Sequence, residues 1–540
     1  MDNLHNAVVV CATELTMHQE SAVNLLVDEI EKRTRIRLTR VNSWPTHAAP
    51  TVFVGTRSHF EHLGQLPGLS LGAENLDGPE GYRICTLVKD GAPVVLVIGN
   101  DTRGMLYGVG YLLRKLVMRF DEIMLPDDID VTTAPVYALR GHQVGYRDKT
   151  NSYCAWDVDQ WDQYFRDLVV FGANAIELIP PRSDDESDSV QFPLPPLRMM
   201  TEMSRLADLY DLDVWIWFPA LDEDYGDPDT IAFALNEWRE VFEALPRIDA
   251  IFVPGGDPGK TPPDQLMHLL EKQTEQLHKF HAGAQMWVSP QGFTQQWLDE
   301  FFVFLEQDRP DWFTGVVHGP WVHLTIAELR SIVPDRYPIR NYPDITHTLS
   351  SQFPVPNWDP AFALTIGREP INPRPQDQVA IFKYSQPHTL GFLTYCEGCT
   401  DDINKVIWSG LGWNPDVDVA DVLQDYGRYF IGADYAADFS DGVLALEENW
   451  RGAALTNVGI DVTLKKFQAM ERAASPFELR NWRFLQGLYR AYYDAYVRRR
   501  LIYETELEAQ ALEVLARAGE VGTLAAMAET ESHIERTLGH

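Results

Sequence analysis

A repeated unit that begins after residue 134 constrains the fold of this chain more than any other feature. In each unit a short apolar run ends in glycine, proline, aspartate or histidine, and an amphipathic helical pattern follows it. The apolar runs predict strands at residues 138–145, 174–179, 213–218, 248–253, 284–288, 313–317, 337–341 and 391–395. Helical patterns lie between them, for example at 158–171, 230–245, 262–281 and 295–307. These patterns are long enough to connect parallel strands.

Eight such units in series predict a closed (β/α)8 barrel, and an open doubly wound sheet is the structural alternative. We favour the barrel because about 280 residues is close to the usual size of that fold. In addition, no glycine-rich dinucleotide motif follows any of the predicted strands.

The segments on either side of the barrel have different patterns. Apolar runs at 7–10, 51–54 and 94–98 alternate with helical patterns at 21–33 and 104–116, which predicts a small α/β domain. After residue 416 only helical patterns occur, at 420–430, 435–449, 461–474, 477–507 and 509–517, and we expect residues 529–540 to fray. The predicted fold class is therefore α/β, with an N-terminal α/β domain (1–133), a central barrel (134–415) and a C-terminal helical domain (416–540).

The charge of the chain limits its partners. Its 79 acidic and 45 basic side chains give a net charge of −34, which repels nucleic acid and anionic membranes. Five scattered cysteines do not form a disulfide framework, and the start of the chain lacks the pattern of an export signal, so we expect a cytoplasmic protein. Helical C-terminal domains often form dimers, which makes a homodimer a candidate assembly.

The loops that follow barrel strands form one face of this fold, where active sites lie. Aromatic rings there can stack on sugar rings, while polar groups bind sugar hydroxyls. The predicted strand ends supply these candidate sugar-binding residues: Arg140, His142, Glu177, Arg182, Trp217, Asp222, His318, Trp321, Tyr342, His347, Tyr395, Asn404 and Lys405. Two of them have an equally strong alternative. Glu177 could be the buried partner of Arg140 or Arg182, and Asp222 could belong to a solvated loop.

Three carboxylates at strand ends are candidate catalytic residues. Hydrolysis of a glycosidic bond needs two carboxyl groups, one protonated as an acid and one ionised as a base or nucleophile. Asp257, Asp344 and Glu397 follow the fourth, seventh and eighth predicted strands. Asp257 lies among glycines that allow close approach of backbone or ligand. We predict Asp257 as the acid and Glu397 or Asp344 as the base or nucleophile.

Metal and cofactor sites are less favoured. Cys396 and Cys399 have a zinc-like spacing, but no second pair accompanies them. His142, His318 and His347 could converge on a metal, although hydrogen bonding to sugar or carboxylate is the better reading. The sequence has no phosphate loop and no G-x-S-x-G nucleophile elbow, which argues against phosphoryl and acyl transfer. We expect no cofactor.

Several motifs resemble a clan of exo-glycosidases, which includes α-glucuronidases of families 67 and 115 and β-N-acetylhexosaminidases of families 20 and 84. The segments 80–84 (EGYRI) and 97–108 resemble the end of the small domain that precedes the barrel in that clan. Residues 395–408 and 412–415 (GWNP) resemble the late barrel motif of family 115, and 318–320 (HGP) is similar to a sixth-strand motif of family 67. Two positions depart from the clan: Pro258 replaces the acid of family 20, and Val322 replaces an aspartate of family 67.

The resemblance implies an exo-acting glycoside hydrolase that removes a terminal sugar from an oligosaccharide or glycoside. A uronic acid is one candidate sugar, as in an α-glucuronidase, because Arg140, Arg182 and Lys405 are expected near the barrel mouth. The alternatives are a β-N-acetylhexosaminidase-like enzyme and a non-catalytic carbohydrate-binding protein on the same fold.

Overall fold

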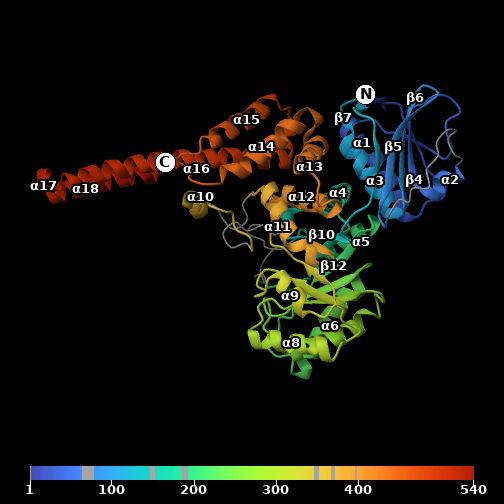
Figure 1. Cartoon of the computed structure of the whole chain (residues 1–540), viewed down its shortest axis with the longest axis horizontal. Helices are drawn as coiled ribbons and strands as arrows, with labels where there is room; N and C mark the ends of the chain where they lie inside the picture. The colour runs from blue at the N-terminus through green and yellow to red at the C-terminus, as the bar shows by residue number, and fades with distance from the viewer. Residues whose placement is uncertain are drawn as a thin grey trace.

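The computed structural model describes residues 2–63, 78–145, 152–184, 192–345, 352–365, 371–395 and 398–539. It contains an N-terminal domain built on a mixed sheet, a central barrel of eight parallel strands and a group of C-terminal helices (Figure 1). This arrangement confirms the predicted fold class.

The N-terminal domain is a six-stranded sheet packed against helices on both faces. Its strand order is β3 (Thr39–Val41), β2 (Val8–Val10), β4 (Thr51–Thr56), β6 (Ala92–Gly99), β5 (Tyr82–Lys89) and β9 (Asp130–Thr133). The helices are α1 (Met17–Thr34), α2 (Arg57–His62) and α3 (Thr102–Lys115). A smaller sheet contains β1 (Asp2–Asn3), β8 (Glu122–Leu125) and β7 (Val117–Arg119). The predicted strands in this domain are parallel, whereas β5 and β9, which the sequence analysis did not predict, add to the sheet in antiparallel orientation.

All eight predicted barrel strands are confirmed, and pairing of the first with the last closes the barrel. The strands are β10 (Leu139–Gln143), β11 (Ala175–Leu178), β12 (Asp213–Trp217), β13 (Ala250–Pro254), β14 (Gln285–Ser289), β15 (Gly315–His318), β16 (Ile339–Asn341) and β17 (Gly391–Thr394). The helices between and after them include α4 (Val158–Val170), α5 (Pro196–Leu209), α6 (Pro228–Ala244), α7 (Pro263–Leu277), α8 (Gln295–Gln307), α9 (Ile326–Ile332), α10 (Pro360–Thr365), α11 (Pro375–Ser385) and α12 (Asp402–Trp413).

The strand register decides which side chains point into the barrel. Gln143 pairs with Glu177, and Glu177 pairs with Trp215, so these three side chains lie on the same side of the sheet. Arg340 of β16 contacts both Glu177 and the Trp215 ring across the barrel, which identifies that side as the interior. Because side chains alternate along a strand, the residues on either side of each inward residue face the surrounding helices.

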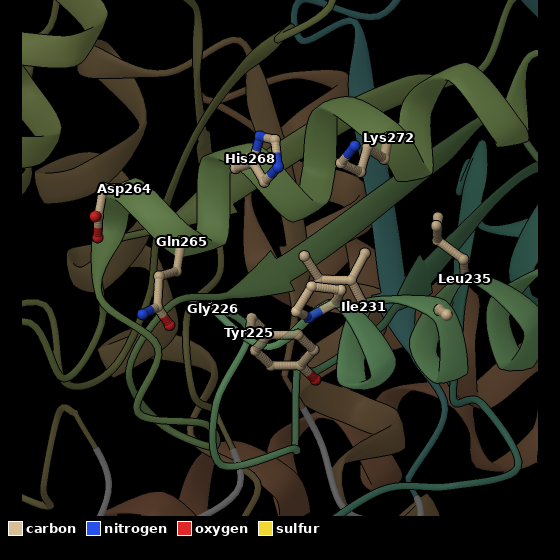
Figure 2. Close-up of a pocket in the computed structure, with 10 residues that line it drawn as sticks. Tyr225, Gly226, Ile231, Leu235, Asp264, Gln265, His268 and Lys272 are labelled. Carbon is tan, nitrogen blue, oxygen red and sulfur yellow. The ribbon is translucent and has the colours of Figure 1, made fainter.

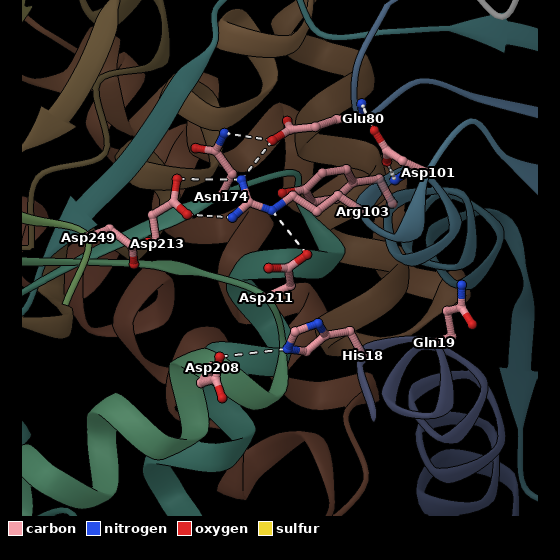
Figure 3. A network of polar contacts seen from close by, with 12 residues as sticks. His18, Gln19, Glu80, Asp101, Arg103, Asn174, Asp208, Asp211, Asp213 and Asp249 are labelled. Atoms are coloured by element: carbon pink, nitrogen blue, oxygen red, sulfur yellow. Dashed lines mark hydrogen bonds and ion pairs between the residues drawn. The ribbon is translucent and has the colours of Figure 1, made fainter. Parts of the chain in front are cut away.

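The N-terminal domain closes the amino end of the barrel through Arg103 of α3 (Figure 3). Its guanidinium nitrogens lie 2.5 Å from Asp213 Oδ1, 3.3 Å from Asp211 Oδ2 and 3.0 Å from Glu80 Oε1. Glu80 in turn accepts a hydrogen bond from Arg140 of β10. Ion pairs therefore link the two domains at the end of the barrel opposite the strand-end loops.

The C-terminal helices are α13 (Val419–Tyr426), α14 (Ala436–Asn449), α15 (Gly459–Ala473), α16 (Trp482–Ala516), α17 (Ala518–Val521) and α18 (Thr523–Glu535). Two expectations are wrong here. No break occurs near residue 508, because α16 is one continuous helix. Residues 529–535 do not fray, because α18 packs along the distal half of α16, where Thr530 Oγ1 donates to the Ala511 carbonyl at 3.3 Å (Figure 1). No helix in the described ranges, the 35-residue α16 included, is long and apolar enough to cross a membrane.

Candidate active site

Tyr342, Asp344 and Tyr395 come together at the carboxyl ends of β16 and β17. Asp344 and Tyr395 form a parallel β-bridge, and their exposed fractions are 4% and 9%. The rings of Tyr342 and Tyr395 lie 5.6 Å apart. Trp217, the last residue of β12, lies two positions after the inward Trp215 and therefore faces the same interior. The structure thus gathers four of the predicted site residues at the barrel mouth.

A buried ion pair forms the floor beneath this mouth. Arg340 Nη1 lies 2.6 Å from Glu177 Oε2, and both side chains are fully buried. Gln143 Nε2 donates to Glu177 Oε1 at 3.0 Å and to the Tyr342 hydroxyl at 2.7 Å. Burial raises the pKa of Glu177, and the positive charge of Arg340 opposes that rise. The partner of Glu177 is therefore Arg340, and neither Arg140 nor Arg182 fills that role.

Hydrogen bonds join the loops after β13, β14 and β15 into one rim. The Gly256 N–H donates to the Gln291 carbonyl at 2.8 Å, and the Gly292 N–H donates to the Trp321 carbonyl at 2.9 Å. The side-chain nitrogen of Gln291 donates to the carbonyl of Asp257. Gly292 has φ +71°, and a Cβ there would lie 2.7 Å from the Gly256 carbonyl carbon. Glycine is required because the two loops pack backbone against backbone.

Asp257 and Trp321 are both exposed on this rim. The Asp257 side chain is exposed, and the Trp321 side chain is 61% exposed. Trp321 has φ +59°, in the left-handed region that a bulky residue rarely adopts. Such strain persists where the surrounding structure fixes the backbone, and it often marks a functional position. An exposed indole at this position is suited to stacking on a sugar ring.

Arg182 and Asp222 follow neighbouring strands, but they bind each other. Arg182 Nη1 lies 3.0 Å from Asp222 Oδ1, and its Nε lies 2.7 Å from Glu237 Oε1 on α6. The Tyr225 hydroxyl donates to Asp222 at 3.1 Å. The alternative in which Asp222 belongs to the outer loop therefore fits its contacts better than direct sugar binding.

A groove of about 630 Å³ lies between α6 and α7, next to Tyr225 (Figure 2). Ile231, Leu235, His268 and Lys272 also line it. These side chains come from the helical layer around the barrel, and none of the predicted site residues lines the groove. We therefore place the candidate site at the barrel mouth.

Arg140, His142 and His318 face outward, so their predicted roles in sugar binding are corrected. Arg140 lies near the amino end of β10, where its Nε donates to the Gly172 carbonyl at 2.9 Å. Both ring nitrogens of His142 are 2.8 Å from hydroxyls, those of Thr394 and Ser409. His318 Nε2 lies 3.0 Å from the Leu324 carbonyl. Burial lowers the pKa of both histidines.

Asn404 and Lys405 lie on α12, outside the barrel wall. The Asn404 amide donates to the Asn372 carbonyl at 2.6 Å and accepts from the Arg374 N–H at 2.9 Å. Lys405 is 1% exposed. Its Nζ donates to the hydroxyls of Tyr153 and Tyr164, the latter at 2.9 Å. The predicted sugar contact of Asn404 is wrong, because its amide holds the segment before α11, and Lys405 is enclosed by aromatic rings.

Two predicted residues, Glu397 and His347, lie outside the described residues, as does Cys396 of the CxxC motif. In the part of the chain that the structure describes, no cluster of three or more histidine, cysteine or carboxylate side chains is arranged to hold a metal ion.

Sequence reasoning missed Gln143, Gln291 and Arg340. Arg340 had a usable signal, because a charged residue inside a short buried strand needs an ionic partner.

Comparison with known proteins supports a fold-level likeness. No family model matches the chain, and no curated protein matches it either. Among solved structures, the 4-O-methyl-α-glucuronidase BtGH115A is similar, with a TM-score of 0.60 and 13% identity over 99% of this chain and 77% of that chain. CpGH84B is similar with a TM-score of 0.58 and 12% identity over 99% and 92% of the two chains.

A mutant Streptomyces plicatus β-hexosaminidase with bound GlcNAc is also similar, with a TM-score of 0.52 and 13% identity over 80% of this chain and 91% of that chain. At these identities the likeness concerns the fold alone. The chain thus has the eight-stranded barrel fold of glycoside hydrolases of families such as 84, 115 and 20.

Proposed function

We propose that the protein is an exo-acting glycoside hydrolase, with Asp257 as the acid and Asp344 as the base or nucleophile. The proposal rests on the kinds of side chain that lie at the barrel mouth. Carboxylates follow β13 and β16, and the aromatic residues Trp217, Trp321 and Tyr342 lie at the same end of the barrel. Paired carboxylates beside stacking rings are the requirement of glycoside hydrolysis. A bound sugar would cover Asp257 and withdraw it from water, which favours its protonated form.

The charges near the mouth favour a neutral terminal sugar over a uronate. The uronate expectation depended on three cations. Arg140 binds Glu80 at the opposite end, Arg182 is paired with Asp222 and Glu237, and Lys405 is buried behind β17. Arg340 does face the interior, but Glu177 neutralises it. A uronate carboxylate would therefore have to compete with existing ion pairs.

The test is product release from a panel of α- and β-linked aryl glycosides that includes N-acetylhexosaminides and uronides. We expect cleavage of a neutral glycoside, and a loss of about a hundredfold or more in kcat for Asp257→Asn and Asp344→Asn. Asp222→Asn is the matched control, because that carboxylate is engaged by Arg182, and it should retain a near wild-type rate. The first anomer seen by NMR distinguishes inversion from retention.

Silence across the panel together with a sugar-dependent rise in Tm would contradict the proposal. That outcome would identify a carbohydrate-binding protein, because a ligand stabilises the folded state whether or not it reacts. Preferential cleavage of uronides would overturn the preference for a neutral sugar and leave the hydrolase intact.

A further inference from the structure

Three exposed tyrosines form a row along one face of α16, outside the candidate active site. Tyr489, Tyr492 and Tyr496 are 60%, 41% and 52% exposed, and we call them the tyrosine row. Residues at these spacings lie on the same side of a helix. The three rings therefore lie along one side of the helix.

The row begins close to the barrel mouth. One turn before Tyr489, Gln486 Nε2 donates to the carbonyl of Cys399 at 3.3 Å, in the segment that follows β17. The Tyr493 hydroxyl donates to the Thr365 carbonyl at the end of α10, at 2.5 Å. From these contacts α16 runs out past α10 and away from the barrel (Figure 1). The row therefore begins about one helical turn from the segment that follows β17.

Neighbouring groups hold the rings of the row in place. The Tyr492 hydroxyl donates to Glu471 Oε2 at 2.8 Å and accepts from Gln468 Nε2 at 3.2 Å. Arg500 Nη1 donates to the Tyr496 hydroxyl at 3.3 Å. Tyr489 stacks on Tyr493, with ring centroids 6.1 Å apart. Rings fixed in this way lose little further freedom when a ligand binds.

The residue type changes along this face of α16. Where α18 covers the helix, the buried side chains are the small or aliphatic Leu507, Ala511 and Val514, which suit helix packing. The uncovered part carries tyrosines instead. An aromatic ring suits a sugar ring, because the ring face meets the C–H groups of the sugar. Tyr489 and Tyr496 are about 10 Å apart along the helix axis, a length that two sugar units of an extended glycan can span.

We propose that the tyrosine row binds an extended glycan chain whose terminal sugar enters the barrel mouth. The preferred substrate is then an oligosaccharide or polysaccharide rather than a small glycoside. This inference rests on the proposed hydrolase function for the direction of the chain, but binding at the row is measured separately from hydrolysis.

Affinity electrophoresis tests the binding step. The Asp257→Asn protein is run through native gels containing arabinogalactan, glucuronoxylan, pectin or no polysaccharide, so that hydrolysis does not change the probe. We expect retardation by at least one polysaccharide, weakened about tenfold in apparent affinity when all three tyrosines of the row are changed to alanine. Changing the same three to phenylalanine keeps the rings and should keep most of the retardation. Trp321→Ala measures the contribution of the mouth.

A kinetic comparison separates this inference from the proposed function. If both are right, the triple alanine variant retains wild-type kcat/KM on an aryl glycoside and loses about tenfold on the retarding polysaccharide. The inference is overturned if no polysaccharide retards the protein, or if the proteins with and without the three tyrosines are retarded equally. Neither result bears on the proposed hydrolysis of aryl glycosides. A wild-type dimer that becomes a monomer in the alanine variant, as seen by light scattering, also overturns it, because the row would then be covered by a second copy.

Discussion

The side-chain nitrogen of Gln291 donates a hydrogen bond to the backbone carbonyl of Asp257. This contact fixes the loop that carries the proposed acid to the loop after β14. We expect Gln291→Ala to lower kcat by about tenfold to a hundredfold with a smaller change in KM, because a small displacement of a catalytic group has a large effect on rate.

The matched control for Gln291 is Gln296→Ala. Gln296 lies on the exposed face of α8, and its side-chain nitrogen donates to Glu300 at 2.8 Å. It should leave kcat and KM unchanged in the same aryl glycoside assay. Equal kcat values for Gln291→Ala and the wild type would show that the rim does not position Asp257.

We expect the left-handed backbone conformation of Trp321 to lower the stability of the fold, and its exposed ring to contribute to substrate binding. Replacing it with glycine or alanine removes the exposed ring, so both variants should raise KM by a similar factor. Glycine alone relieves the left-handed backbone strain, so Trp321→Gly should be more stable than Trp321→Ala by about 1 kcal/mol. Thermal unfolding of the two variants measures this difference. A lower Tm for the glycine variant would contradict the account of strain.

We expect each charge of the buried Glu177–Arg340 pair to be tolerated only because the other charge is present. Glu177→Gln leaves the guanidinium of Arg340 buried without its counter-charge and should lower the free energy of unfolding by about 3–5 kcal/mol. Adding Arg340→Met removes that charge as well, so the double variant should be more stable than the single one. Urea unfolding of the four proteins in the cycle gives the coupling energy. Additive losses would show that the pair is not coupled.

The burial of His142 predicts that the protein loses stability in mild acid. Burial lowers its pKa well below 6.5, so the folded state stays neutral there while the unfolded chain binds a proton. Stability is therefore complete above pH 6.5 and falls as the pH drops below that value, by up to about 1.4 kcal/mol per pH unit. We expect His142→Gln to be less stable at pH 7.5 but to show a shallower fall of Tm between pH 7 and pH 5. The exposed His268→Gln should keep the wild-type slope, and identical slopes for all three proteins would contradict the prediction.

The barrel was predictable because each strand is an apolar run next to a helical pattern, and that periodicity is local. It was harder to predict whether an individual side chain points into the barrel or toward the surrounding helices. Strands buried on both faces, such as β15 and β16, lack the alternation of apolar and polar residues that reveals which side is inside. His142 and His318 were therefore assigned to the wrong side. The Glu177–Arg340 pair joins residues 163 positions apart, and only the closed barrel makes them neighbours.

The position of Arg103 has a consequence for how this molecule could be shortened or recombined. A barrel cut out at residue 134 would leave Asp213 and Asp211 without Arg103, and Arg140 without Glu80. Arg247 would still pair with Asp211 and Asp213, but the charge that Arg103 supplies would be lost, and Arg140 would lose its carboxylate partner. A fusion protein or a transplanted barrel would therefore have to include the N-terminal domain together with the barrel.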